Sequence, residues 1–293
     1  MCEKVTNILL DNAMSQKLVR FDWAMKKLLR SKANFGILEG FLSELLKLDL
    51  KILNILESES NKDEKDDKYN KVDVLVELQN KEIVLIEVQI TSQSDYFHRI
   101  LYGTSRIITE YLNEGEEYSN IKKVYSVNIL YFDLGHGIDY IYHGTTSFTG
   151  IYQHDQLDLN KTQKLLYQKE YVHQIYPEYY LIKVNQFNDV AKDTLDEWIY
   201  FLKNEEIKDD FRAKGLLEAK EKLDSMKLPM KEKQEYKRYL ENSRQKESEF
   251  GSTYNTGKVE GKIEVAKNLK ALGMTNETIQ KATDLSLEEI EKI

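Results

Sequence analysis

Residues 71–90, with the sequence KVDVLVELQNKEIVLIEVQI, decide the fold. Two apolar runs flank the polar residues 79–82, and runs so rich in Val, Ile and Leu around a short link that contains Asn predict two antiparallel strands joined by a tight turn. Three polar side chains, Asp73, Glu87 and Gln89, stand inside these runs. A carboxylate on a buried strand is destabilising unless it is paired, hydrogen-bonded or bound to a metal ion. Each acid in the hairpin therefore needs a partner.

The register of the hairpin decides whether the two acids meet. Side chains alternate along a strand, so Glu87 and Gln89 share one face. A three-residue loop at 79–81 sets Asp73 opposite Glu87, whereas a two-residue loop at 80–81 sets Asp73 opposite Val88. Asn80 tolerates the left-handed backbone that the longer loop needs, so the three-residue loop is allowed, and the sequence leaves both registers open.

In the three-residue register, two carboxylates converge on one face of the sheet, with Glu39 from a preceding helix as a third candidate. Their mutual repulsion favours a divalent cation, and ligands that are all oxygen atoms suit Mg²⁺ or Mn²⁺. Such an ion lowers the pKa of a bound water and stabilises negative charge on a phosphate in the transition state. This arrangement best serves the hydrolysis of a phosphodiester bond.

Simpler interpretations of the same residues exist. Asp73 and Glu87 could face solvent on a half-exposed strand, as many acids do. Glu44 lies on the same predicted helix as Glu39, and either could be an ordinary surface acid. The five histidines show no ligand-like spacing and Cys2 is the single cysteine, so no zinc site is expected.

Hydrophobic spacing around the hairpin predicts an α/β domain. In the segment 94–113, an amphipathic helix is expected with Phe97, Leu101, Ile108 and Leu112 facing inward. The predicted elements, in chain order, are a helix at 34–48 with Asn34 as its N-cap, a strand at 48–57, the hairpin, the helix at 94–113, strands at 123–134, 139–144 and 178–187, and a helix at 190–204.

Beyond residue 205 the composition changes to Lys- and Glu-rich helical sequence with few large apolar residues. We predict a domain at 1–205 and a helical extension at 206–293, which comprises linker helices at 206–250 and a small helical tail at 251–293. In the tail we expect a helix, a turn at Gly273, a helix opened by residues 275–277 and a last helix capped by Ser286. The expected core of the tail is Leu269, Leu272, Ile279, Leu285 and Ile290.

The tail core is too small for independent stability, so the tail should dock on the catalytic domain, on a second copy of the tail or on DNA. Its exposed acids oppose phosphate binding, which favours docking or self-association over contact with DNA. The net charge of −8 likewise excludes a generally basic coat, although a local basic cleft could still bind nucleic acid. With one cysteine, no signal-peptide pattern and no apolar run of about 18 residues, the sequence predicts a cytoplasmic protein without a membrane segment.

The order of elements, with Asp73 on the second strand and 87–89 on the third, resembles the PD-(D/E)XK nuclease superfamily. More narrowly, FDWAMKKLLRSKANFGILEGFLSELL, VDV, LIEVQI, FHRILYG and VYSVNIL resemble the recombination-promoting nuclease or putative transposase family, called Rpn. The segment GKVEGKIEVAKNLKALGMTNETIQKATDLSLEEIEKI is similar to the tail common in those proteins. The resemblance covers about 21–200 and 257–293. It implies a restriction-endonuclease-like core, in which helices flank a mixed central sheet, followed by an all-α extension.

The resemblance also implies roles for single residues. Asp73 and Glu87 would be the metal-binding acids, and the carbonyl of Val88 could add a ligand. Glu39 matches the acidic residue on the first helix, which makes it a further catalytic candidate.

Gln89 stands where the superfamily motif has lysine, although glutamine is usual in the Rpn-like branch. A glutamine cannot supply positive charge, but its amide can orient a catalytic water by donating and accepting hydrogen bonds. Arg99 and Tyr102 fall on the helix after the motif, where they could contact DNA phosphates.

The expected function is that of a metal-dependent DNA endonuclease that uses Mg²⁺ or Mn²⁺ and acts in recombination or for a mobile element. The expected partners are DNA and a second copy of the chain, bound through the C-terminal helices. The rival hypothesis is a catalytically inactive DNA-binding or assembly protein that retains the nuclease fold, as would follow if Gln89 has abolished cleavage.

Overall fold

The computed structural model describes residues 18–56, 74–112, 115–225 and 227–293. The chain divides into two compact units, Met1–Leu228 and Pro229–Ile293, which are described separately below. The boundary expected near 206 differs from this division, because α7 (Leu216–Lys222) packs against α3 (Phe35–Leu46) within the first unit. Residues 206–225, 227 and 228 thus belong with the sheet domain in the structure.

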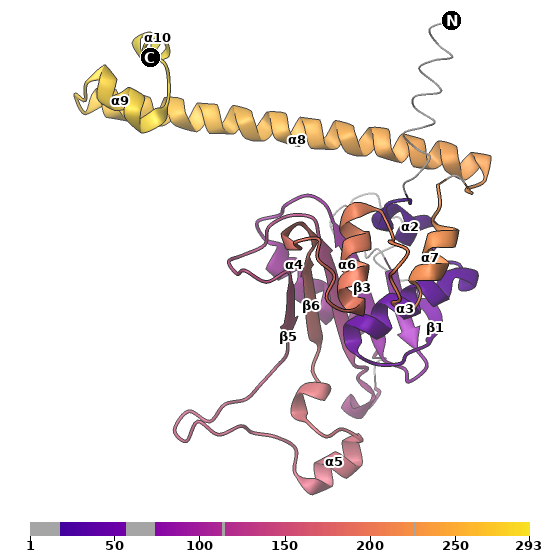
Figure 1. Cartoon of the computed structure of the whole chain (residues 1–293). Helices are drawn as coiled ribbons and strands as arrows, with labels where there is room; N and C mark the ends of the chain where they lie inside the picture. The colour runs from indigo at the N-terminus through magenta and orange to yellow at the C-terminus, as the bar shows by residue number, and fades with distance from the viewer. Residues whose placement is uncertain (1–17, 57–73, 113–114, 226) are drawn as a thin grey trace, which may run out of the picture. The chain divides into compact units, whose positions relative to one another are not determined.

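A six-stranded mixed sheet forms the centre of the first unit (Figure 1). The strands are β1 (Ile52–Leu56), β2 (Val74–Leu78), β3 (Ile83–Gln89), β4 (Val124–Leu130), β5 (Ile141–Gly144) and β6 (Glu178–Lys183), in the spatial order β1-β2-β3-β4-β6-β5. β3, β4 and β6 run parallel to one another, and the other neighbours are antiparallel. The predicted fold class and every strand predicted from the sequence are confirmed.

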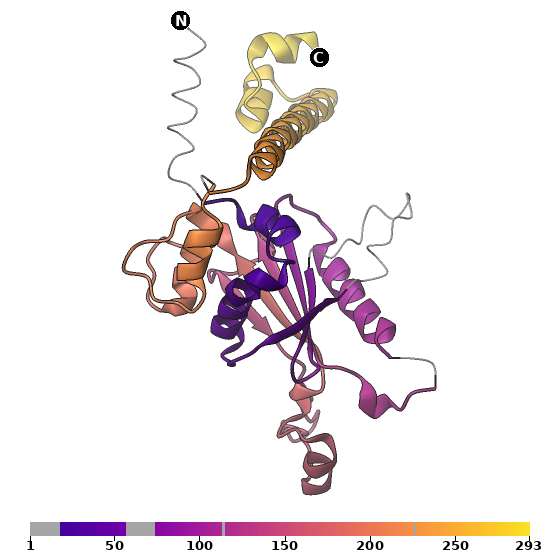
Figure 2. The same ribbon diagram turned by 90° about the vertical axis from the view of Figure 1, so that its right-hand side faces the viewer.

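Helices cover both faces of this sheet (Figure 2). α2 (Phe21–Lys27), α3 and α6 (Thr194–Asn204) lie on one face, where Phe41 and Trp198 pack with their ring centroids 5.5 Å apart. α4 (Tyr96–Glu110) covers the other face, where Ile107 packs with Leu85 of β3. The remaining short 3₁₀ segments of this unit are Lys32–Asn34, Tyr118–Asn120, Val172–Gln174 and Val184–Gln186.

The inward face of α4 differs from the prediction. Phe97 and Leu101 are more than half exposed. The buried positions are Tyr96, Ile100, Thr104 and Ile107. A count of apolar residues alone assigns Tyr96 and Thr104 to the surface, but the Tyr96 hydroxyl has polar partners inside the protein, so the buried stripe begins one residue earlier.

The segment that follows α6 closes over α3 at a backbone-to-backbone contact. A Cβ at Gly40 would collide with the carbonyl of Lys214, so only glycine fits there. Gly215, which follows Lys214, has φ +83°, a backbone angle that also favours glycine. The indole of Trp198 donates to the same Lys214 carbonyl at 3.2 Å. These contacts join α3, α6 and α7 into one layer.

Within the first unit, residues 18 and 19 contact its last part. The amide of Leu18 donates to the carbonyl of Glu205 at 3.1 Å, and the amide of Val19 donates to the carbonyl of Leu223 at 2.8 Å. Segments far apart in the sequence therefore lie side by side here.

Residues 145–177, between β5 and β6, form an arm that extends away from the sheet and contains α5 (Lys161–Tyr167) (Figure 1). None of these residues is buried. No element was predicted for this part of the chain.

The second unit is helical, as predicted. It consists of α8 (Met230–Ala271), α9 (Asn276–Thr283) and α10 (Leu287–Lys292), with the turn at Gly273 and side-chain caps from Thr275 and Ser286. Its core is Ala266, Ile279, Leu285 and Ile290. Leu272, expected in this core, is 78% exposed. No helix in the described part of the chain is both long and apolar enough to cross a membrane.

Candidate active site

The register of the β2–β3 hairpin is the one that a three-residue loop requires. Val74 lies opposite Ile86, which is the pairing that the three-residue loop predicts. Asp73 itself lies outside the described residues. The same register, continued by one step, predicts that Asp73 is opposite Glu87.

The turn explains this register. The amide of Leu78 donates to the carbonyl of Glu82, and the amide of Lys81 donates back to the carbonyl of Leu78, both at 2.9 Å, which encloses the loop 79–81. The residue with left-handed backbone is Lys81 (φ 70°) rather than Asn80. The side chain of Asn80 instead accepts a hydrogen bond from the amide of Glu82 at 3.2 Å and holds the turn closed.

Glu87 is buried on β3, under α4. Its Oε2 lies 3.5 Å from the Tyr96 hydroxyl and 3.5 Å from Nε of Arg99, two side chains of α4. The Tyr96 hydroxyl also donates to Oδ1 of Asn128 at 3.2 Å. Asn128 is the residue of β4 that lies beside Glu87 in the parallel pairing of β3 and β4. A buried carboxylate is thus surrounded by an arginine, a tyrosine and an amide.

The residues Tyr96 and Asn128 were not identified from the sequence. Asn128 is itself held by Ser126, whose hydroxyl accepts from its Nδ2 at 3.0 Å, and both residues are buried. A signal was present, because Ser126 and Asn128 are polar residues two apart in the apolar run VYSVNIL, on the face that Glu87 shares.

The carbonyl of Val88 and the side chain of Gln89, the other predicted groups of the motif, lie at the end of β3. The carbonyl of Gln89 accepts from the amide of Tyr131 at 3.0 Å. Carbonyls alternate in direction along a strand, so the carbonyl of Val88 points toward the β2 side. The side-chain amide of Gln89 donates to the carbonyl of Thr91 at 3.1 Å and to its hydroxyl at 3.3 Å, close to the surface.

Arg99 and Tyr102 line a surface hollow of about 620 Å³ beside this strand end. Arg99 connects the hollow to the buried acid, because its Nη1 donates to Oε1 of Gln93 at 3.1 Å while its Nε faces Glu87. The other residues of the hollow are Ser92, Ser94, Asp95 and His98. A cationic side chain at such an opening can bind a phosphate.

Glu39 lies elsewhere. Its Oε2 accepts from Nζ of Lys51 at 2.7 Å and its Oε1 accepts from the amide of Ile52 at 2.9 Å, which ties α3 to the start of β1. Glu44, the other acid of α3, accepts from the hydroxyl of Thr194 at 2.5 Å. Both acids belong to α3, and the structure does not bring them to the acid that faces α4.

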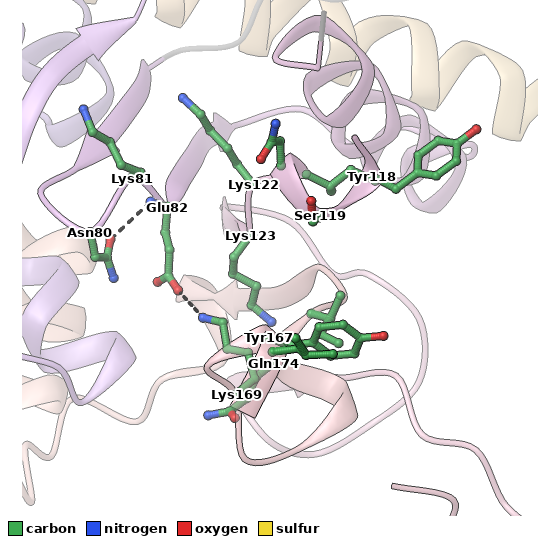
Figure 3. A pocket seen from close by; sticks show the side chains of 14 residues that line it. Asn80, Lys81, Glu82, Tyr118, Ser119, Lys122, Lys123, Tyr167, Lys169 and Gln174 are labelled. Carbon is green, nitrogen blue, oxygen red and sulfur yellow. Dashed lines mark hydrogen bonds and ion pairs between the residues drawn. The ribbon is translucent and has the colours of Figure 1, made fainter. Parts of the chain in front are cut away.

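A second hollow of about 620 Å³ lies at the opposite end of β3 (Figure 3). Its acid, Glu82, accepts from Nζ of Lys169 at 2.9 Å and from the Tyr125 hydroxyl at 3.0 Å. Lys122, which also lines it, pairs with Glu77 at 3.0 Å. Volume does not distinguish the two hollows. We place the candidate active site at Glu87 because the predicted motif, residues 87–89, ends β3 beside the first hollow.

The donors at the candidate site fit a hard divalent cation. Glu87 and the carbonyl of Val88 offer oxygen atoms, which Mg²⁺ and Mn²⁺ prefer. Within 18–56, 74–112, 115–225 and 227–293, no three His, Cys, Asp or Glu side chains gather as potential metal ligands. The second predicted acid, Asp73, lies outside these ranges.

Comparison with known proteins agrees with this geometry. A family model described as a PD-(D/E)XK nuclease family transposase matches residues 19–251, which include the hairpin, α4 and β4. No curated protein and no solved structure was found to match. The resemblance noted from the sequence is thereby confirmed for residues 19–251, and nucleases of this kind generally use divalent metals and act on DNA. The chain belongs to the PD-(D/E)XK nuclease family transposases.

Proposed function

We propose that this protein is a metal-dependent DNA endonuclease that serves recombination or a mobile element. The family supports nuclease activity in general. The observation that supports the finer proposal is the hairpin register, because Val74 opposite Ile86 is the pairing expected if the preceding residue, Asp73, shares the face of the buried carboxylate of Glu87.

In this proposal Asp73, Glu87 and the carbonyl of Val88 hold one Mg²⁺ or Mn²⁺. A bound divalent ion supplies positive charge that lowers the pKa of water and stabilises negative charge on the cleaved phosphate. The Tyr96 hydroxyl, which contacts both Glu87 and Asn128, holds the Glu87 carboxylate in position, as residues around a metal ligand commonly do.

The remaining groups act on water and on the DNA backbone. Gln89 lacks a charge, so its role is to orient the attacking water through its amide. Arg99 and Tyr102 bind a phosphate at the hollow, where the guanidinium can form charge-assisted hydrogen bonds.

Cleavage should require Mg²⁺ or Mn²⁺. Nicking of a supercoiled plasmid, followed on agarose gels, should stop in excess EDTA and return when Mg²⁺ is restored. Ca²⁺ should bind, as measured by calorimetry, without supporting efficient turnover, because it prefers more ligands and looser geometry. Activity that persists in excess EDTA would show that the proposed ion is not needed.

The rival function is a catalytically inactive DNA-binding or assembly protein. The specific observation in its favour is Gln89, which replaces the lysine of the superfamily motif. Such a protein would bind a labelled duplex in fluorescence anisotropy but would not nick it at any concentration of Mg²⁺ or Mn²⁺.

We further propose that the C-terminal helices support self-association rather than DNA binding. The exposed surface of α9 and α10 is acidic, which opposes phosphate contacts. The acids concerned are Glu277, Asp284, Glu288, Glu289 and Glu291.

Deletion of residues 252–293 should leave metal-dependent cleavage of short DNA measurable and should lower the molar mass per particle in light scattering by more than the deleted residues account for. The reason is that the deletion removes the whole tail core and none of the candidate catalytic residues. Loss of DNA affinity with an unchanged oligomeric state would instead make the tail the DNA-binding element.

A further inference from the structure

The arm, residues 145–177, has a defined backbone but no core. Local polar contacts hold it: Asn160 and Gln163 form a capping box at α5, and the amide of Val172 donates to Oδ1 of Asp158 at 2.7 Å. Fixing the backbone of each residue opposes folding by about 1 to 2 kcal/mol, and burial of apolar side chains usually offsets this. Within one copy of the arm that offset is small, because Phe148 and Tyr176 pack with their ring centroids 5.4 Å apart but no residue of the arm is buried.

The apolar side chains of the arm are instead exposed. Ile151 is 83% exposed, Tyr152 89%, Leu165 74% and Leu166 73%. At roughly 150 Å² for each large side chain, these residues together with Leu157 expose on the order of 600 Å² in total. A standard protein interface buries about 800 Å² per partner, so these side chains amount to a large share of one.

The charge of the arm selects the kind of partner. Its lysines, 161, 164 and 169, are balanced by Asp155, Asp158 and Glu170, so the formal net charge is zero with neutral histidines. DNA would require an excess of cations. In a two-fold symmetric dimer the same surface of each copy contacts itself. Because the arm is neutral and apolar, two arms can meet without charge repulsion, although the whole chain has a net charge of −8.

The arm is also anchored at its base, where it meets the sheet (Figure 3). Nζ of Lys169 lies 2.9 Å from Oε1 of Glu82 on the hairpin turn, and Nζ of Lys123 donates to the carbonyl of His173 at 2.9 Å. An anchored arm loses little freedom when it binds, which favours association.

We propose that the arm is the surface through which two copies of this chain associate, with Tyr152, Leu165 and Leu166 buried in the contact. This interface is separate from the C-terminal helices. It does not depend on nuclease activity.

The test is the oligomeric state of the full chain carrying Leu165→Glu and Leu166→Glu. Light scattering after size exclusion, at tens of micromolar protein, should show the mass per particle halved relative to wild type, with an unchanged far-UV circular dichroism spectrum because both residues are exposed within one chain. Leu217→Glu is the matched control, since Leu217 is 75% exposed on α7 and should leave the mass unchanged. A monomeric wild type, or a double variant that keeps the wild-type mass, overturns the proposal.

A cross-linking experiment tests the contact directly. Cys2 is the single cysteine, so Cys2→Ser with Leu166→Cys gives one thiol per chain. A short bis-maleimide should link two copies through residue 166 and should fail with Leu217→Cys in the same background. Equal linking at both positions, or none at residue 166, contradicts an interface built on the arm.

Discussion

Replacing Glu87 by glutamine should lower DNA cleavage by at least about 100-fold, which is the range found when a group that stabilises the transition state is removed. Glutamine keeps the volume of the side chain and can still face Tyr96 and Arg99, but it lacks the negative charge that the proposed ion needs. Rates of plasmid nicking at saturating Mg²⁺ measure the effect, and circular dichroism checks that the fold is intact. Asp73→Ala should cause a similar loss.

Glu77→Gln provides the control for this experiment. Glu77 is a buried acid on β2 of the same hairpin, but its carboxylate is bonded to Lys122 at 3.0 Å. Its replacement should leave the cleavage rate within a few-fold of wild type. If both variants lose activity equally, the effect comes from the hairpin fold and not from a metal ligand at residue 87.

The largest effect on stability is expected for Lys123→Met. Nζ of Lys123, which is buried, donates to Oε1 of Glu178 at 2.8 Å and to the carbonyls of His173 and Tyr176. Methionine fills similar space but leaves Glu178 buried with only part of its partners. Breaking a buried ion pair in this way destabilises a protein by about 3 to 5 kcal/mol.

Urea unfolding at pH 7 measures this change. Burial alone would raise the pKa of Glu178, but the hydrogen bonds from Lys123 and His143 lower that pKa below its ordinary value of 4.5. The stabilisation is therefore present above about pH 4.5 and is lost as the pH falls through the folded-state pKa, so pH 7 lies in the region where it is complete. The control is Lys164→Met, whose pairing with Glu170 is exposed, so the free energy of unfolding should hardly change. A change below about 1 kcal/mol for Lys123→Met would contradict the assignment.

The sequence was sufficient for the two strands of the hairpin because strand alternation is strict, but it left two loop lengths open, and the pairing of Val74 with Ile86 decided between them. It failed for the inward face of α4, where Tyr96 and Thr104 are buried polar residues that hydrophobic spacing assigns to the surface. The same limitation hid Tyr96 and Asn128, whose importance depends on their contacts with each other and with Glu87.

The arm and the backbone contact over α3 could not be predicted from the pattern of apolar residues. The arm is built from local caps and turns, so its sequence lacks any helical or strand periodicity long enough to detect. The closure over α3 rests on the contact between Gly40 and the backbone at Lys214, which composition does not reveal. The change in composition near residue 206 therefore marked a lower content of large apolar residues, whereas the compact unit extends to Leu228.

The meeting of residues 18 and 19 with residues 205 and 223 affects how the protein can change over evolution. A unit in which a segment near its start is bonded to segments near its end can be exchanged as a module. Segments joined at this point can be lengthened, exchanged or lost through gene fusion without altering the order of the strands or the surroundings of Glu87. One nuclease core could in this way be inherited with many different appended sequences, each giving it another partner while the chemistry stays the same.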